Sequence, residues 1–229
     1  MIRLEGISFA YDLAHPVLEQ VDFALSAGER VALNGPNGAG KTTLLHLMVG
    51  LVRPQKGRVV AFGRERRTET DFIEVRSRAG LLFQDADDQL FCPTVAEDIA
   101  FGPLNQGKSR AEARAIVRQT LADLGLESLE NRVTHKLSGG QRRLVSLAAV
   151  LAMRPEALLL DEPTNALDEP TRGRLLDILA GLPLAMVIVS HDRGVLDRLA
   201  TRSAWLEGGG FGQSRSDSAI RAPQTLAGA

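Results

Sequence analysis

The chain has 229 residues, enough to bury one substantial core with a smaller subdomain attached. Its formal net charge of -1 gives no reason to expect a chain-wide attraction to nucleic acid or anionic lipid, so a specific site must carry the function. The single cysteine excludes an internal disulfide framework and fits a reducing compartment, for which the cytoplasm is the natural interpretation. No apolar run approaches the roughly 20 residues that cross a membrane, and the N-terminus lacks a signal-peptide pattern, so we expect neither a membrane span nor export.

Short strands are predicted at the start of the chain. Residues 2–9 partly alternate, residues 17–25 follow a His15-Pro16 break, and residues 30–33 lead into a glycine-rich segment. Together these strands predict an antiparallel N-terminal layer.

A helix and further strands are predicted after the glycine-rich segment. Residues 41–49 carry apolar side chains at helical spacing, and Gly50 supplies a stop. Runs with short continuous apolar cores, typical of strands buried on both faces, occur at residues 58–62, 80–83, 157–160 and 185–190. This pattern favours an α/β sheet.

Helices are predicted in the middle of the chain, where a capping box runs from Ser109 to Glu112 ahead of an apolar helical pattern. We place a helical subdomain at about residues 85–155, inserted in one domain of residues 1–208. Residues 209–229 are rich in glycine, serine and alanine with little periodicity, and we expect them to form a flexible tail.

A phosphate-binding loop is predicted between the third strand and the first helix, where the sequence fits G-x-x-x-x-G-K-[ST] as Gly35-Pro36-Asn37-Gly38-Ala39-Gly40-Lys41-Thr42. Glycines let such a loop curl so that backbone N–H groups face phosphates, and the following helix adds its positive end. Lys41 would supply a charge to the β- and γ-phosphates, and Thr42 a hydroxyl to Mg²⁺. A chance glycine turn before a helix is disfavoured by this context and by the other motifs.

Two carboxylates, Asp161 and Glu162, end a predicted buried strand, where the loops of a parallel sheet meet the ligand crevice. Asp161 suits the coordination shell of Mg²⁺, and Glu162 suits orienting the attacking water or accepting its proton. A strand that ends in Asp-Glu is more often only a solvated strand end. Its pairing with the phosphate loop reverses that expectation.

A second helix start with glycines follows Leu137. Ser138 and Gln141 have the spacing of a capping box, which a purely structural helix start would explain. Gly139 and Gly140 need another reason, because glycines cost helix stability yet expose N–H groups to an anion. We interpret the segment as a second phosphate site. Since the chain has one complete phosphate-loop lysine, the simplest use of this site is to bind the γ-phosphate held by another copy.

Along the chain the phosphate loop comes first, then Leu-Ser-Gly-Gly-Gln, then the strand that ends in Asp-Glu. This order resembles that of the ABC ATPase family, and the resemblance covers nearly all of residues 1–208. The resemblance implies an α/β P-loop NTPase fold with a mixed central sheet, ATP and Mg²⁺ as ligands, and ATP hydrolysis coupled to transport across a membrane. It covers the phosphate loop, the signature sequence Leu-Ser-Gly-Gly-Gln and the strand that ends in Asp-Glu.

The resemblance also implies roles for residues that would otherwise be taken for surface groups. Gln84 resembles the Q-loop glutamine that senses metal and attacking water, and His191 the switch histidine at the γ-phosphate. Asp168 resembles the D-loop aspartate that contacts the partner across a dimer. Tyr11 is similar to the aromatic that stacks on adenine, although a simple β-edge tyrosine is a serious alternative.

By the same resemblance, the residues that bind nucleotide are Tyr11, Gly35, Pro36, Asn37, Gly38, Ala39, Gly40, Lys41, Thr42 and Thr43. The signature residues that meet the partner's nucleotide are Leu137, Ser138, Gly139, Gly140 and Gln141. The catalytic residues are Glu162, His191 and Gln84, and Mg²⁺ is held by Thr42, Gln84 and Asp161.

Two copies arranged head to tail are a further implication of the resemblance. Each nucleotide would lie between one phosphate loop and the partner's residues 138–141, so that ATP closes the pair and hydrolysis lets it reopen. Every catalytic motif is intact in this chain, which allows a symmetric homodimer.

Residues 83–103 resemble the corresponding region of energy-coupling factor transporter ATPases, particularly their cobalt/nickel branch. In that family the short helix around Gln89 helps to receive coupling helices of the transmembrane partner. The alternative is that Leu90, Phe91 and Val95 only pack the helical subdomain, and both roles can coexist.

The resemblance therefore predicts a peripheral subunit at the cytoplasmic face of the cell membrane. We expect its partners to be a second copy, a transmembrane coupling protein and a substrate-binding membrane subunit, with no nucleic acid. Cobalt is the preferred cargo, nickel is the close alternative, and a vitamin such as biotin is a further one. Because the four histidines are scattered and Cys92 is alone, substrate choice must lie in the partners.

A soluble ABC ATPase of DNA maintenance is the main alternative of a different class. Those proteins carry a long coiled coil between the nucleotide motifs, for which this chain has no room, and ABC proteins that act on ribosomes usually have two cassettes. A P-loop kinase would share Lys41 but leave residues 137–141 unexplained. A noncatalytic scaffold is disfavoured by the retained Glu162 and His191.

Overall fold

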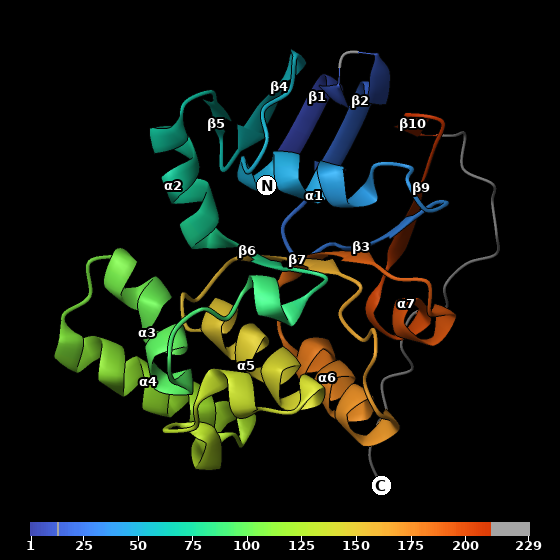
Figure 1. The fold of residues 1–229 in the computed structure, drawn as a ribbon. Coiled ribbons are helices and arrows are strands. Elements are labelled where there is room, and N and C mark those ends of the chain that lie inside the picture. The colour runs from blue at the N-terminus through green and yellow to red at the C-terminus, as the bar shows by residue number, and fades with distance from the viewer. Residues whose placement is uncertain (13, 212–229) are drawn as a thin grey trace, which may run out of the picture.

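The computed structural model describes residues 1–12 and 14–211, whose strands form two sheets (Figure 1). The smaller sheet has the order β2-β1-β4-β5. Its strands are β1 (Ile2–Asp12), β2 (His15–Leu25), β4 (Lys56–Ala61) and β5 (Arg64–Arg66). Every pairing in it is antiparallel, so the expected antiparallel layer is present.

The larger sheet has the order β10-β9-β3-β8-β7-β6. Its strands are β3 (Arg30–Asn34), β6 (Ala79–Leu82), β7 (Ala157–Asp161), β8 (Ala185–Val189), β9 (Arg202–Glu207) and β10 (Gly210–Phe211). The neighbours from β9 to β6 are parallel, whereas β10 runs antiparallel to β9. The sheet is therefore mixed, as predicted.

Two strands join a different sheet from the one that the sequence pattern suggested. The run at residues 30–33 belongs to β3 in the larger sheet, and the run at residues 58–62 belongs to β4 in the antiparallel sheet. β4 buries Val59 and Ala61 but only half-buries Val60, so it has one core face. A short apolar run does not distinguish one buried face from two, and its pairing partner is set by contacts distant in sequence.

Helices cover the larger sheet on both faces. Figure 1 shows α1 between the two sheets and α3, α4, α5 and α6 on the opposite side of the larger sheet. The α-helices are α1 (Lys41–Val49), α2 (Glu69–Arg78), α3 (Val95–Asn105), α4 (Arg110–Leu124), α5 (Gly139–Leu151), α6 (Glu169–Gly181) and α7 (Arg193–Leu199). Short 3-10 helices are η1 (Ala86–Asp88), η2 (Glu127–Leu129) and η3 (Thr134–Lys136).

The larger sheet contributes side chains to two hydrophobic clusters, one on each of its faces. In β7, Leu159 belongs to the cluster around α1, while Leu158 and Leu160 belong to the cluster around α3 to α7. Successive strand residues point to opposite faces, so a strand covered on both sides must be apolar throughout. This explains the continuous apolar run and places Asp161 at the carboxyl edge of the sheet.

The region where we expect the helical subdomain contains η1, α3, α4, η2, η3 and α5. Both capping boxes that the sequence indicates are formed, by Ser109 with Glu112 at α4 and by Ser138 with Gln141 at α5. The tail expected from residue 209 begins with β10, and its residues 212–229 lie outside the described residues. No helix in the described part of the chain is long and apolar enough to span a membrane.

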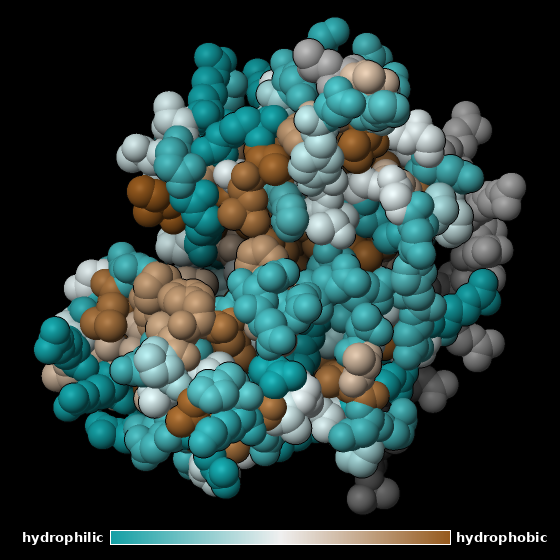
Figure 2. Space-filling view, in the orientation of Figure 1, coloured by the Kyte–Doolittle hydropathy of each residue, from teal (hydrophilic) through white to brown (hydrophobic). Residues whose placement is uncertain are grey.

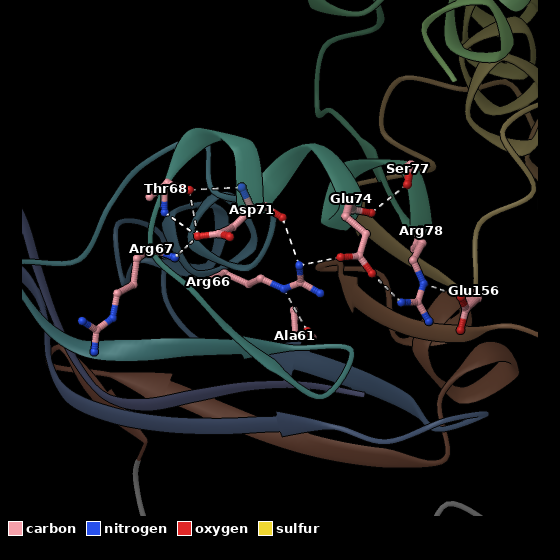
Figure 3. A network of polar contacts seen from close by, with 9 residues as sticks. All are labelled: Ala61, Arg66, Arg67, Thr68, Asp71, Glu74, Ser77, Arg78 and Glu156. Carbon is pink, nitrogen blue, oxygen red and sulfur yellow. Dashed lines mark hydrogen bonds and ion pairs between the residues drawn. The ribbon is translucent and has the colours of Figure 1, made fainter. Parts of the chain in front are cut away.

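Helix α2, which the sequence analysis did not predict, is fixed by the polar network in Figure 3. The guanidinium of Arg66 donates to Glu74 Oε2 at 2.6 Å, and Arg78 donates to the other Glu74 oxygen at 3.0 Å. Arg78 also donates to Glu156 at 2.6 Å, just before β7. The network ties α2 to β5 on one side and to the larger sheet on the other.

Candidate functional site

The loop between β3 and α1 has a shape that depends on its glycines. Gly35 and Gly40 have positive φ angles of 146° and 97°. A Cβ on Gly35 would lie 2.0 Å from the Leu206 carbonyl oxygen, and one on Gly40 would lie 2.9 Å from a Leu18 methyl. Gly40 is also the N-cap of α1 and provides no side-chain cap. The loop therefore presents backbone N–H groups at a helix start, which is the arrangement that binds anions.

The side chain of Lys41 folds back onto this loop and binds its backbone. Its Nζ donates to the carbonyl oxygens of Gly35 and Pro36, both at 2.8 Å. Burial lowers the pKa of Lys41, whereas the charges of Glu162 and Asp161 act to raise it. The ammonium is thus held at the loop where it can contact a bound phosphate.

Thr42 and Asp161 come together although they are far apart in sequence. Thr42 Oγ1 donates to Asp161 Oδ2 at 2.6 Å, across the space between the start of α1 and the end of β7. Asp161 is buried. A hydroxyl and a carboxylate in contact are the hard oxygen ligands that Mg²⁺ prefers, so this donor set fits that ion.

Glu162 directly follows β7 in a strained conformation, with a positive φ of 44°. Its backbone N–H donates to Val189 O at 2.9 Å, and the backbone N–H of His191 donates to Oε2 at 3.4 Å. His191 Nε2 lies 3.4 Å from Oε1, which has no hydrogen-bond partner among the described residues.

Burial is the main cause that raises the pKa of Glu162, and the nearby His191 charge opposes it. The Glu162 side chain is only 16% exposed. A largely shielded carboxylate that has a raised pKa and one oxygen without a hydrogen-bond partner is suited to accepting a proton from water.

One pocket of about 600 Å³ collects most of the residues expected to contact the nucleotide. From the expected set it is lined by Tyr11, Asn37, Gly38, Gly40, Lys41, Thr42, Thr43, Gln84, Asp161, Glu162 and His191. Four different loops therefore converge on one space. The neighbouring cavity is also lined by Gln84, Thr42 and Asp161, so Gln84 lies where the two cavities meet.

Tyr11 lies at the mouth of the pocket and is 65% exposed. Its ring packs edge-on against Phe9 with centroids 4.8 Å apart, and its hydroxyl lies 3.3 Å from Thr43 Oγ1. The ring is held by neighbours on one side and leaves surface for stacking on the other.

The signature residues and Asp168 do not line this pocket. Ser138, Gly139 and Gln141 are exposed, and Gly139 lines the neighbouring cavity. Leu137 is buried. Asp168 is the N-cap of α6, where its carboxylate accepts from Thr171 N at 2.8 Å. In a single chain these groups therefore lie apart from the phosphate loop's pocket.

Four residues near the site were missed by the sequence analysis. Val17, Asn165 and Val189 line the pocket, and the buried Arg143 lines the neighbouring cavity. Val17, Asn165 and Val189 carry no distinctive pattern. Arg143 could have been noticed, because it lies next to Leu144 and Val145 on a helix whose middle is otherwise apolar.

Comparison with known proteins assigns the chain to a protein family. The sequence pattern of the family described as ABC transporter matches residues 18–165, more than half of the chain. The chain belongs to the ABC transporter family. It is an ATP-binding subunit of that family, whose ATPases couple ATP hydrolysis to transport.

Relatives of this ABC transporter subunit cover most of its length. A putative ABC transporter ATP-binding protein of Brucella suis biovar 1 is 54% identical over 91% of this chain and 87% of its own. The cobalt import ATP-binding protein CbiO of Rhodobacter capsulatus is 47% identical over 89% of this chain and 74% of its own. An energy-coupling factor transporter ATP-binding protein of Methanothermobacter thermautotrophicus is 40% identical over 91% and 68%.

A solved ABC cassette has the same fold and shows a nucleotide-bound dimer. It is described as a dimeric post-hydrolysis state of an ATP-binding cassette bound to ADP and Pi. The two chains superpose with a TM-score of 0.85 at 26% identity, covering 97% of this chain and 100% of the other.

Proposed function

We propose that this ABC ATPase powers an energy-coupling factor importer whose cargo is cobalt. The observation that carries the membrane-coupled part of this proposal is an apolar groove next to the cavity that adjoins the nucleotide pocket. The similarity to relatives named for cobalt import and for energy coupling supports the finer assignment. Nickel and a vitamin such as biotin are the alternative cargoes.

The groove lies between α2 and α3. Figure 2 shows hydrophobic side chains on both sides of the hollow between these helices. Ile73 and Leu51 line one side, and Phe91 and Phe101 line the other, with their rings edge-on at 4.7 Å. Phe91 is 65% exposed. Apolar surface of this kind on a chain without a spanning helix among its described residues fits a helix presented by a membrane partner.

The same segment also packs the helical region. Leu90 and Val95 are buried, so they serve the core, whereas Phe91 points to the groove. The side chain of Gln89 accepts from Phe83 N at 3.4 Å and donates to Leu81 O at 3.3 Å. A partner that moves this segment would therefore also move the backbone next to Gln84.

Nucleotide binding is assigned to the phosphate loop, with the adenine at Tyr11. Lys41 and the loop N–H groups would bind the β- and γ-phosphates. Thr42, Asp161 and Gln84 would hold Mg²⁺, which neutralises phosphate charge when bound. The contact between Thr42 and Asp161 already brings two of these ligands together.

Hydrolysis is assigned to Glu162, His191 and Gln84. Glu162 would orient the attacking water and accept its proton at Oε1, which has no hydrogen-bond partner among the described residues. His191 lies on the adjacent loop, where its imidazole would contact the γ-phosphate, and Gln84 would contact both metal and water.

A head-to-tail homodimer would complete each site. The partner's residues 137–141 and Asp168 would meet the nucleotide. This is supported by the exposed position of Ser138, Gly139, Gln141 and Asp168, outside the pocket of their own chain. ATP would close the dimer, and loss of the γ-phosphate contacts would reopen it. In this arrangement the subunit lies peripherally at the cytoplasmic membrane face, bound to a transmembrane coupling protein and a substrate-binding subunit.

The test is uptake by membranes that contain this chain with the membrane proteins encoded beside it. Cobalt, nickel and biotin are compared in parallel, with ATP hydrolysis measured on the same membranes and Glu162→Gln as the inactive control. We expect ATP-dependent cobalt uptake that the substitution abolishes. Nickel or biotin uptake instead would replace the cargo, and ATP hydrolysis that moves none of the three would overturn this cargo assignment.

A further inference from the structure

Arg143 is a buried arginine on the first turns of α5, only 4% exposed. A guanidinium has five N–H donors in a fixed planar fork. Each of them can be matched with a backbone carbonyl here, and the acceptors are the carbonyl oxygens of Phe83, Gln84, Asp161, Glu162 and Pro163. All five N–H donors of the side chain therefore have a main-chain carbonyl as acceptor.

These carbonyls belong to two separate loops that each carry a proposed catalytic residue. Phe83 and Gln84 follow β6, whereas Asp161 ends β7 and Glu162 and Pro163 follow it. Arg143 Nη2 donates to Glu162 O at 2.8 Å and to Asp161 O at 3.0 Å, while Nη1 donates to Phe83 O and, at 3.4 Å, to Gln84 O. One rigid group therefore spans the gap between the two loops.

Among the described residues no carboxylate accepts a hydrogen bond from Arg143. Burial lowers the pKa of Arg143 to about 10, although the charges of Asp161, Asp85 and Glu162 act to raise it. The group therefore remains charged at neutral pH. A buried charge of this kind is costly to folding, and an apolar side chain of similar size often serves a core better. Its retention needs a reason other than packing.

The strained backbone of Glu162 supplies that reason. Glu162 has a φ of 44°; its N–H donates to Val189 O, and its carbonyl oxygen accepts from Arg143 and from the backbone N–H of Asn165. A residue in this sparsely populated conformation persists only where its surroundings hold it. Arg143 is one of three groups that do so, and the one among them that also binds the Gln84 loop.

We propose that Arg143 is a positioning residue that holds the Gln84 and Glu162 loops at a fixed separation, so that both side chains meet the same water and γ-phosphate. The inference rests on the proposed roles of those two residues. Because Arg143 lies two positions after the signature sequence, it also ties the start of α5 to the catalytic loops of its own chain.

Arg66 provides a matched control for the purely structural contribution of a buried arginine. Its guanidinium is also buried and donates to two carbonyls, those of Ala61 and Asp71, and to Glu74 (Figure 3). Arg66 is the last residue of β5 and binds residues of α2, and it does not line the nucleotide pocket. A methionine at either position removes the charge and keeps a long side chain.

The experiment compares Arg143→Met, Arg143→Lys and Arg66→Met as full-length chains, below the unfolding temperature of each. For Arg143→Met we expect kcat for ATP hydrolysis to fall by about 10- to 100-fold, with KM for ATP changed by less than about threefold. Arg143→Lys should recover part of kcat, because an ammonium has three donors and lacks the planar fork. Arg66→Met should lose thermal stability and keep its kcat.

Unchanged kcat in both Arg143 variants would overturn the proposal, and so would an equal loss of kcat in Arg66→Met. If Arg143→Met does not fold, Arg143→Lys decides: a kcat equal to that of the unsubstituted chain overturns the inference. An increase in KM with kcat retained would assign Arg143 to nucleotide binding and also overturn it.

A double substitution separates this inference from the proposed function. If Arg143 acts through Glu162, then Arg143→Met should reduce the residual rate of Glu162→Gln by much less than it reduces the unsubstituted rate. Additive losses would overturn the positioning role alone. Full activity of Glu162→Gln would instead remove the proposed base, whatever Arg143 does.

Discussion

Two helices of this ATPase begin with glycines, α1 after the phosphate loop and α5 at the signature sequence, and their first turns differ. The N-cap of α1 is Gly40, which is buried and offers no side-chain cap. The N-cap of α5 is Ser138, which is exposed and accepts from Gln141 N at 3.2 Å. Gln141 Oε1 accepts from Ser138 N at 3.0 Å, which completes the box.

The difference indicates which half of the proposed composite nucleotide site a single chain forms by itself. The α1 loop already has its lysine, the proposed metal ligands Thr42 and Asp161 in contact, and a pocket around them. The α5 start is capped by its own side chains and presents Gly139 to solvent, with open space where a Cβ would be. A helix start that is satisfied by itself and open outward is suited to a ligand brought by another molecule.

Substitution of the proposed base, Glu162, should have the largest effect on ATP hydrolysis. Glu162→Gln keeps the size of the side chain but removes the proton acceptor, so we expect kcat to fall by about 100- to 10,000-fold. ATP binding should be preserved, and an ATP-loaded dimer should accumulate on size-exclusion chromatography. Normal turnover in this variant would mean that another group activates the water.

The pH dependence of hydrolysis gives a second measure of Glu162. Burial raises the pKa of Glu162 above its usual value of 4.5, and the carboxylate must be ionised to accept a proton. Activity should therefore be lost as pH falls through a value above 4.5, and the residual activity of Glu162→Gln should lack that limb. An acid limb that is identical in both proteins would assign it to a different group.

Removal of the phosphate-loop charge comes next in size. Lys41→Ala deletes a charge-assisted contact worth about 1.5–3 kcal/mol, so ATP affinity should weaken by about 10- to 100-fold. The measurement is equilibrium binding of ATP to the isolated chain, with His46→Ala, on the next turn of α1 and outside the nucleotide pocket, as a comparison. Unchanged affinity in Lys41→Ala would count against its contact with phosphate.

The two glycines of the signature sequence, Gly139 and Gly140, have different surroundings and can be tested separately. A Cβ on Gly139 meets nothing within 4 Å, whereas one on Gly140 would lie 2.9 Å from a Thr171 side-chain atom. Gly139→Ala should keep or raise stability, by up to about 1 kcal/mol, because alanine favours a helix.

We expect Gly139→Ala nevertheless to lower ATP hydrolysis by roughly tenfold, because the added methyl lies where the partner's phosphate would approach the helix N–H groups. ATP affinity of the isolated chain should not change. Unaltered hydrolysis would indicate that no ligand comes close to Gly139. Gly140→Ala, which crowds Thr171, separates a packing defect from loss of the approach.

Much of this architecture could be predicted from local sequence, and the exceptions share a cause. The phosphate loop, the buried β7 run and both capping boxes are local patterns, and all of them form. Which sheet β3 and β4 join depends on pairings between distant residues, which no local pattern encodes.

In the site, too, the residues that belong to local motifs could be predicted and those that act through distant contacts could not. The pocket brings together residues that motifs single out, such as Lys41 and Glu162. Arg143 escaped notice because its importance lies in carbonyls from two loops about 20 and 60 positions away, and a backbone acceptor leaves no mark on residue type. Helix α2 was missed although Thr68 and Asp71 form a capping box, because its apolar pattern is weak.

The smallest expected effect compares two capping boxes of the same kind. Ser109 caps α4 with Glu112 as Ser138 caps α5 with Gln141, so Ser109→Ala and Ser138→Ala should each lower the free energy of unfolding by about 1 kcal/mol. The two measurements are urea unfolding and ATP hydrolysis on both variants. Because α4 lines no part of the nucleotide pocket, Ser109→Ala should keep its activity. Ser138→Ala should lose a further severalfold of hydrolysis, since its hydroxyl and the neighbouring N–H groups would face the partner's γ-phosphate. Equal activity in the two variants would make Ser138 a helix cap and nothing more, and would leave the glycines alone to carry the second phosphate site.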